Sequence, residues 1–96
     1  MKLFSVYDAK AECFSPPFCA LATGAAIRSF TDDVNSGDPK SPIAMHPHDF
    51  VLFEIGVFND GDGHLEAYET KKSLGSGIDF QRPMEQALGN VSGLRN

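Results

Sequence analysis

The feature that most constrains the fold is an apolar segment joined by a turn to a second, alternating segment. Residues 50–58 read FVLFEIGVF, the turn reads NDGDG, and residues 64–69 read HLEAYE. Apolar and β-branched residues favour a strand in the first segment, and alternation favours a half-exposed strand in the second. Because Asn, Asp and Gly readily adopt the positive φ values of tight turns, the two segments predict a β-hairpin.

The acidic turn has the composition of a calcium loop but not its spacing. An EF-hand loop needs ligands at positions 1, 3 and 5, Gly at position 6 and Glu at position 12. If Gly63 or Gly61 takes the Gly position, Phe58 falls on a ligand position, and a phenyl ring cannot bind calcium. The motif HPHD at residues 46–49 offers two His and one Asp without further ligands, which is a weak metal signal. No metal site is predicted.

Two further segments predict regular structure. Residues 2–8, KLFSVYD, predict a central strand because apolar side chains fall on both faces. Residues 23–36 predict a helix with Thr23 as N-cap and a stop at Gly37. Its apolar stripe consists of Ile27, Phe30 and Val34.

Prolines interrupt the segments that flank the predicted helix. Pro16 and Pro17 cannot donate ladder hydrogen bonds, so residues 14–22 are expected to be extended, at most an edge strand. Residues 36–49 contain three prolines and predict a long loop without regular structure.

Together these elements predict an α+β fold of order β-α-β-β, a small antiparallel or mixed sheet with one packed helix. Residues 1–69 are expected to form a single domain, and residues 70–96 a partly irregular C-terminal tail, docked or flexible. One helix covers one face, so the face of Phe50, Leu52 and Phe58 is expected to need a second cover. The candidates are the tail, through Ile78, Phe80, Met84 and Leu88, or a second subunit in a homodimer.

Composition and motifs disfavour several classes of function. The net charge is −5 and the eight Lys and Arg residues are scattered, so non-specific DNA binding by charge alone is disfavoured. Cys13 and Cys19 form neither a disulfide scaffold nor a zinc motif. No nucleophile motif or phosphate loop occurs, so we expect no enzyme activity and no cofactor. The N-terminus is too short and polar for a signal peptide or a membrane span, and we expect a cytoplasmic protein.

An ordered series of motifs over residues 1–69 resembles the small nonstructural protein of gokushovirus-type microviruses, which are single-stranded DNA phages. The series begins with Tyr-Asp-x-Lys-Ala and Pro-Pro-Phe, continues with Ala-x-Arg-x-Phe, and ends with His-Pro-x-Asp before Leu-Phe-x-Ile-Gly-x-Phe. The matching residues are Tyr7, Asp8, Lys10, Ala11, Pro16, Pro17, Phe18, Ala26, Arg28, Phe30, His46, Pro47, Asp49, Leu52, Phe53, Ile55, Gly56 and Phe58.

The resemblance implies a non-enzymatic phage protein that acts in single-stranded DNA genome replication or packaging. Such a protein is made in the host bacterial cytoplasm and is absent from the mature virion. Its expected partners are phage replication or capsid-assembly proteins, with single-stranded DNA as a further candidate ligand. Lys10 and Arg28 are the basic residues inside the matching motifs and are the candidate contacts, although Arg28 is also spaced to pair with Asp32 on the helix surface. The alternative is an oligomeric protein–protein adaptor that binds no nucleic acid.

Overall fold

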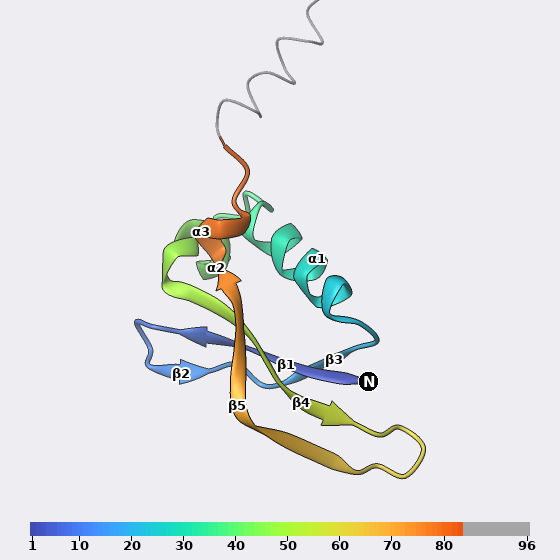
Figure 1. Cartoon of the computed structure of the whole chain (residues 1–96). Helices are drawn as coiled ribbons and strands as arrows, with labels where there is room; N and C mark the ends of the chain where they lie inside the picture. The colour runs from blue at the N-terminus through green and yellow to red at the C-terminus, as the bar shows by residue number, and fades with distance from the viewer. Residues whose placement is uncertain (84–96) are drawn as a thin grey trace, which may run out of the picture.

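A computed structural model describes residues 1–83 of the chain. The fold is α+β, as predicted, with one long helix against an antiparallel sheet (Figure 1). The elements in chain order are β1 (Lys2–Asp8), β2 (Cys13–Phe14), β3 (Phe18–Ala20), α1 (Thr23–Val34), α2 (Pro42–Met45), the 3-10 turn η1 (Pro47–Asp49), β4 (Phe50–Phe58), β5 (Leu65–Ser76) and α3 (Gly77–Phe80).

The sheet has the order β2-β1-β4-β5, and β3 also pairs with β1. Strand β1 is therefore central, as its two apolar faces predicted. The proline-bearing segment forms only β2 and β3, both on the outer side of β1, because Pro16 and Pro17 interrupt the ladder between them. All pairings are antiparallel.

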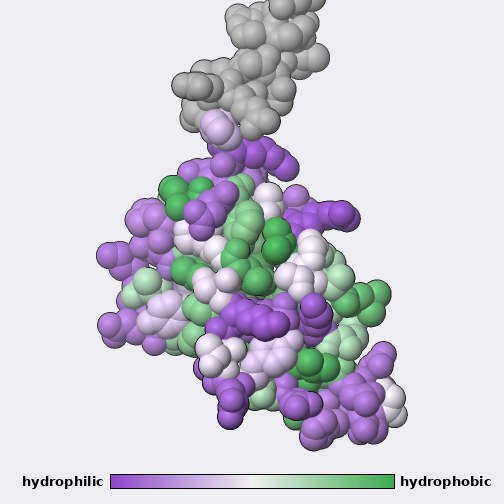
Figure 2. Space-filling view, viewed as in Figure 1, coloured by the Kyte–Doolittle hydropathy of each residue, from purple (hydrophilic) through white to green (hydrophobic). Residues whose placement is uncertain are grey.

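The predicted hairpin is confirmed by the pairing of β4 with β5. The Asn59 amide donates to the His64 carbonyl at 2.8 Å, and the Gly63 amide donates to the Asn59 carbonyl at 2.7 Å. Gly63 has a φ of 78°, which glycine adopts without strain. Hydrophilic residues cover this end of the molecule (Figure 2). Strand β5 extends to Ser76, beyond the predicted end at Glu69, so part of the predicted tail belongs to the sheet.

The predicted helix exists, but both of its ends differ from the prediction. Its N-cap is Ala22, and Thr23 is the first helical residue, because the Thr23 hydroxyl donates to a side chain of the sheet instead of capping the helix. The helix ends at Val34, before Gly37. The expected irregular loop after it contains α2 and η1, and the Ser41 hydroxyl caps α2 by accepting from the Ala44 amide at 3.2 Å.

The predicted choice of sheet face was wrong. Phe50 and Leu52 are 8% and 0% exposed, and they lie in the core beneath α1. They form one buried cluster with Phe4 and Val6 of β1, and Val6 pairs directly with Leu52. The helix contributes Ala26, Phe30 and Val34 to this core, with Ile27 at its margin. Each of these two strands is apolar on both faces. The sequence of one strand therefore does not indicate which face is buried, and this becomes clear only once β1 and β4 are paired.

Two residues of the predicted tail, Leu74 and Phe80, pack against this core. The Phe80 ring of α3 packs edge-on against Phe30, with ring centroids 5.9 Å apart. Ile78 is 53% exposed and contributes little. Met84 and Leu88 lie outside the described residues. Helices α1 and α3 therefore cover the same side of the sheet, and within residues 1–83 the opposite face carries no helix (Figure 1).

Candidate nucleic-acid interface

Three aromatic rings from three strands meet on the sheet face that lies away from α1. The ring centroids of Tyr7 and Phe14 are 4.9 Å apart, and those of Phe14 and Phe53 are 5.4 Å apart. Phe14 is 41% exposed, while Tyr7 and Phe53 are half-buried. We call these three residues the aromatic face. Exposed, adjoining π-surfaces on a sheet are the usual platform for stacking nucleic-acid bases.

Strand register places these rings together. Tyr7 pairs with Phe14, and Ser5 pairs with Phe53, and directly paired residues point to the same face of an antiparallel sheet. Phe4 and Val6 point into the core, so their neighbours Ser5 and Tyr7 point to the opposite face.

Two serines hold Phe14 in position at the interruption between β2 and β3. Ser5 is 1% exposed, and its hydroxyl donates to the Ser15 carbonyl at 2.8 Å. The Ser15 hydroxyl accepts from the Val6 amide at 3.0 Å. These bonds attach the segment that carries Phe14 to β1, just before the prolines, which offer no amide hydrogen.

Lys71 brings a positive charge to the aromatic face. The Lys71 ammonium lies 5.8 Å from the centroid of the Phe14 ring. Its neighbour Lys72 is directed to the other side of the sheet, where it lies 3.8 Å from the Glu54 carboxylate. Adjacent strand residues point to opposite faces, so the Lys-Lys pair supplies one charge to each. Lys71 is exposed and is suited to contact a phosphate beside a stacked base.

The two basic residues selected from the sequence lie elsewhere. Lys10 is exposed in the turn that follows β1, where its amide donates to the Asp8 carboxylate at 3.0 Å. Arg28 is exposed on α1, in the opposite layer from the aromatic face. Among residues 1–83 the expected ion pair between Arg28 and Asp32 does not form. The structure brings neither Lys10 nor Arg28 into the aromatic cluster, and Lys71 was missed because its cation–π contact depends on two edge strands.

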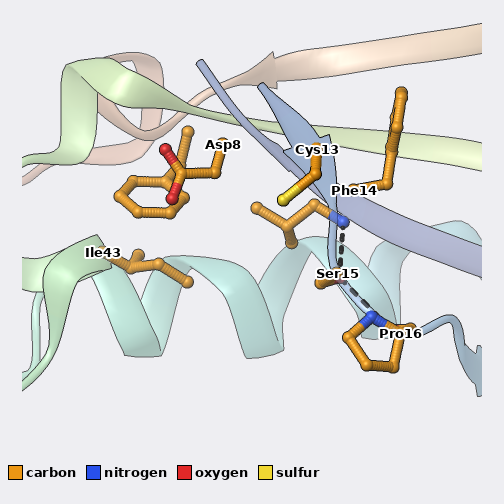
Figure 3. Close-up of a pocket in the computed structure, with 8 residues that line it drawn as sticks. Asp8, Cys13, Phe14, Ser15, Pro16 and Ile43 are labelled. Carbon is orange, nitrogen blue, oxygen red and sulfur yellow. Dashed lines mark hydrogen bonds between the residues drawn. The ribbon is translucent and has the colours of Figure 1, made fainter. Parts of the chain in front are cut away.

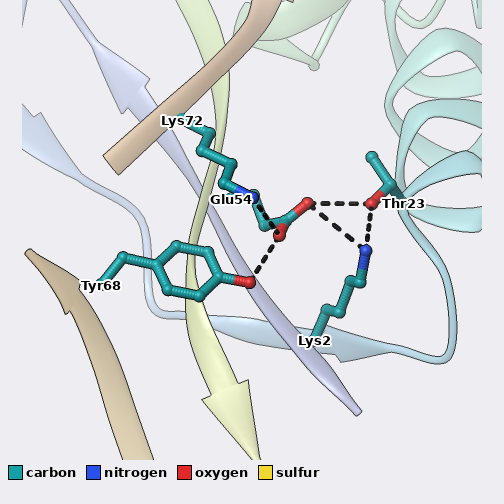
Figure 4. A network of polar contacts seen from close by, with 5 residues as sticks. All are labelled: Lys2, Thr23, Glu54, Tyr68 and Lys72. Atoms are coloured by element: carbon teal, nitrogen blue, oxygen red, sulfur yellow. Dashed lines mark hydrogen bonds and ion pairs between the residues drawn. The ribbon is translucent and has the colours of Figure 1, made fainter. Parts of the chain in front are cut away.

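A polar cluster, distinct from the aromatic face, lies between the sheet and α1 around Glu54 (Figure 4). Its carboxylate is 3% exposed and accepts from the Tyr68 hydroxyl at 2.6 Å and the Thr23 hydroxyl at 2.8 Å. Lys2 lies 4.0 Å and Lys72 3.8 Å from it. The Tyr68 hydrogen bond is the main cause of a pKa of Glu54 below its ordinary value of 4.5. Burial opposes that shift, whereas Thr23, Lys2 and Lys72 reinforce it.

The Glu54 cluster has the properties of a structural site. Both carboxylate oxygens have hydrogen-bond donors, and the lowered pKa keeps the group ionised, so it offers no accessible base to a substrate. The same hydrogen bond raises the pKa of Tyr68. A lone carboxylate in an apolar strand was the sequence signal for this site, but its partners come from three distant segments.

The two candidate metal motifs are built into turns. In η1 the His48 ring nitrogen lies 3.4 Å from the Asp49 carboxylate. In the hairpin, Asn59 and Asp62 accept from the amides of Gly61 and His64. Within residues 1–83 no three His, Cys, Asp or Glu side chains are grouped in a way that would hold a metal ion.

The fold and its aromatic face define a small α+β protein with an open antiparallel sheet. The sequence model of the family described as "Phage ORF5 protein" matches residues 1–80, and the chain belongs to this phage protein family. No curated protein and no solved structure shows significant similarity to the chain. In the described part of the chain, no helix has the length and hydrophobicity needed to cross a membrane.

Proposed function

We propose that this phage protein is a non-enzymatic nonstructural protein of a gokushovirus-type microvirus and binds single-stranded DNA through the aromatic face. It acts in genome replication or packaging in the host bacterial cytoplasm and is absent from the mature virion. The phage family supports the viral role. The observation that carries the DNA-binding proposal is the cluster of Tyr7, Phe14 and Phe53 on the sheet face away from α1, with Lys71 beside it.

The geometry suits stacked bases better than an electrostatic contact with duplex DNA. Each base stacked on an aromatic side chain contributes about 1–3 kcal/mol, with little dependence on sequence. Phe14 has the largest exposed fraction of the three rings, so it is the expected principal platform. A duplex hides its base faces, so the aromatic face should prefer single strands.

The acidic charge balance predicts an unusual salt dependence. Binding to single strands weakens with a log–log slope of about −0.7 for each phosphate neutralised. Lys71 is the cation placed at the aromatic face, and the chain carries a net charge of −5. We therefore expect one or two phosphate contacts and a slope of about −1, much shallower than for proteins that bind through basic grooves.

The test is fluorescence anisotropy with a dye-labelled oligothymidine, with matched truncations. Phe14→Ala removes one stacking ring and should weaken binding roughly fivefold to a hundredfold. Leu21→Ala is the control, because Leu21 is an 81% exposed apolar residue between β3 and α1. Lys71→Ala should reduce the salt slope, whereas Arg28→Ala, on the opposite layer, should leave it unchanged. Equal affinities for Phe14→Ala, Leu21→Ala and the wild type would contradict the proposal.

The second candidate is a protein–protein adaptor with no nucleic-acid binding, in which Lys10 and Arg28 contact a protein. The uncovered sheet face favours it, because an exposed aromatic surface also suits a second subunit. If the protein does not bind oligothymidine at any salt concentration, including low salt, the adaptor is favoured.

A further inference from the structure

An apolar groove lies beside β2, on the opposite side of the sheet from the aromatic face. Its volume is about 370 Å³, which exceeds the roughly 150 Å³ of a cavity that holds benzene. It is lined by Val6, Asp8, Cys13, Phe14, Ser15, Pro16, Ile43 and Phe50. Figure 3 shows Ile43 of α2 across the groove from Cys13, Ser15 and Pro16.

The groove exists because α1 and α2 do not fully cover the edge of the sheet. Val6 and Phe50 form part of the core and are each 8% exposed. Asp8 pairs with both Cys13 and Phe50, so these three side chains belong to the same face as Val6. The groove is thus an accessible extension of the hydrophobic core, large enough for one apolar side chain of a ligand.

Of the described residues that line the groove, Asp8 is the charged one. Its Oδ1 atom accepts from the amides of Lys10 and Ala11, at 3.0 and 3.2 Å. Among residues 1–83 its carboxylate has no ion pair. A carboxylate that has no cationic partner among these residues and lies beside an apolar groove complements a ligand in which an apolar group adjoins a cation.

The edge of β2 adds a backbone contact. Strand β2 pairs only with β1 among the described residues, so its outer edge is open. An extended peptide can pair with such an edge while a side chain enters a pocket beside it. Pro16 and Pro17 limit this pairing to a short segment, because they lack amide hydrogens.

We propose that this groove binds an extended segment of a protein partner, in which a large apolar side chain fills the groove and an adjacent Lys or Arg meets Asp8. This site is separate from the proposed DNA-binding surface. Phe14 lines the groove as well, but its ring points away from Ile43 (Figure 3). One molecule can therefore hold DNA on one face and a protein segment on the other.

Cys13 and Cys19 provide a paired reporter of groove occupancy. Both thiols are free and exposed, but only Cys13 lines the groove. The alkylation rate of each by N-ethylmaleimide is measured by mass spectrometry on the full reduced chain. Three N-acetylated, C-amidated tetrapeptides serve as probes: Ser-Phe-Arg-Thr, Ser-Phe-Glu-Thr and Ser-Ala-Arg-Thr.

The Phe-Arg peptide should protect Cys13 selectively. At about 5 mM peptide and a Kd of about 1 mM, alkylation of Cys13 slows about sixfold, and that of Cys19 does not change. With each of the other two peptides, the factor by which alkylation of Cys13 slows should be smaller by at least about threefold. In Asp8→Asn, which keeps the Oδ1 acceptor of the turn, the preference for Arg over Glu should disappear.

Two results would overturn the proposal. The first is equal Cys13 rates with the Phe-Arg and Ala-Arg peptides, and the second is equal slowing of Cys13 and Cys19. The Cys13 alkylation measurement does not depend on DNA binding. Lys71 belongs to the proposed DNA-binding surface and not to the groove, so Lys71→Ala should retain protection of Cys13. If the wild-type protein does not bind oligothymidine but the Phe-Arg peptide still protects Cys13, the proposed function alone is refuted.

Discussion

Replacing Glu54 with Gln tests whether the buried carboxylate stabilises the fold through its charge. Gln keeps the size of the side chain and one acceptor oxygen but removes the charge. Hydrogen bonds to a charged group contribute about 1.5–3 kcal/mol each, and neutral ones about 0.5–1.5 kcal/mol. Glu54 accepts two short hydrogen bonds, from Tyr68 and Thr23. Their weakening should cost about 2–3 kcal/mol.

One effect offsets part of this loss of stability, and another adds little to it. A neutral amide costs less free energy to bury than a carboxylate does, and this difference offsets roughly 1 kcal/mol of the destabilisation. The side chains of Lys2 and Lys72 are 43% and 64% exposed, so solvent screens their attraction to Glu54 and their loss adds little. The expected net destabilisation at neutral pH is about 1–2 kcal/mol.

The pH dependence separates the charge from the packing. The folded-state pKa of Glu54 lies below 4.5, so the folded protein binds fewer protons than the unfolded chain in that range. Its stabilising contribution is fully present above pH 4.5 and is lost as the pH falls through the folded-state value. The gap between wild type and Glu54→Gln should therefore be largest at neutral pH and should narrow in acid.

The assay is urea denaturation followed by far-UV circular dichroism at pH 7 and at about pH 3. The control is Glu66→Gln, because Glu66 is an exposed carboxylate of the same sheet, in β5. That control should change the free energy of unfolding by less than about 0.5 kcal/mol. A Glu54→Gln deficit of the same size at both pH values, or no deficit at pH 7, would refute the reasoning.

Two other predictions concern the backbone and the assembly. A Cβ at Gly56 would collide with the Glu66 carbonyl, so Gly56→Ala should destabilise the fold by more than about 2 kcal/mol. Gly24, in α1, has open space around its α-carbon, and Gly24→Ala should stabilise by about 0.5–1 kcal/mol; thermal denaturation of both variants compares them directly. The expected homodimer should sediment at twice the mass of one chain, and a single-chain mass at high protein concentration would contradict it.

The hairpin and the long helix were predictable because their signals are local. The β-formers in FVLFEIGVF, the turn residues after them and the apolar stripe of the helix act within a few residues. The central position of β1 was equally clear from its two apolar faces. The β2 and β3 edge segments followed from Pro16 and Pro17, which cannot occupy the interior of a sheet.

Functional surfaces were less predictable because they join distant segments. Tyr7, Phe14 and Phe53 meet through the pairing of β1 with both β2 and β4. Nothing in the local pattern distinguishes these rings from Phe4 or Phe50, which are buried. Lys10 and Arg28 were selected from their motifs, whereas the cation beside the aromatic face is Lys71, from the opposite edge of the sheet.

The sequence by itself determined which segments become strands, helix and turns, since propensity, alternation and turn chemistry are local properties. Only the tertiary structure decided which face of the sheet is the core. The strand Phe50–Phe58 is apolar on both sides, and pairing with β1 set Phe50 and Leu52 on the same face as Phe4 and Val6, the face that α1 buries. That choice also buried Glu54 among its donors and left Phe14 exposed on the opposite face.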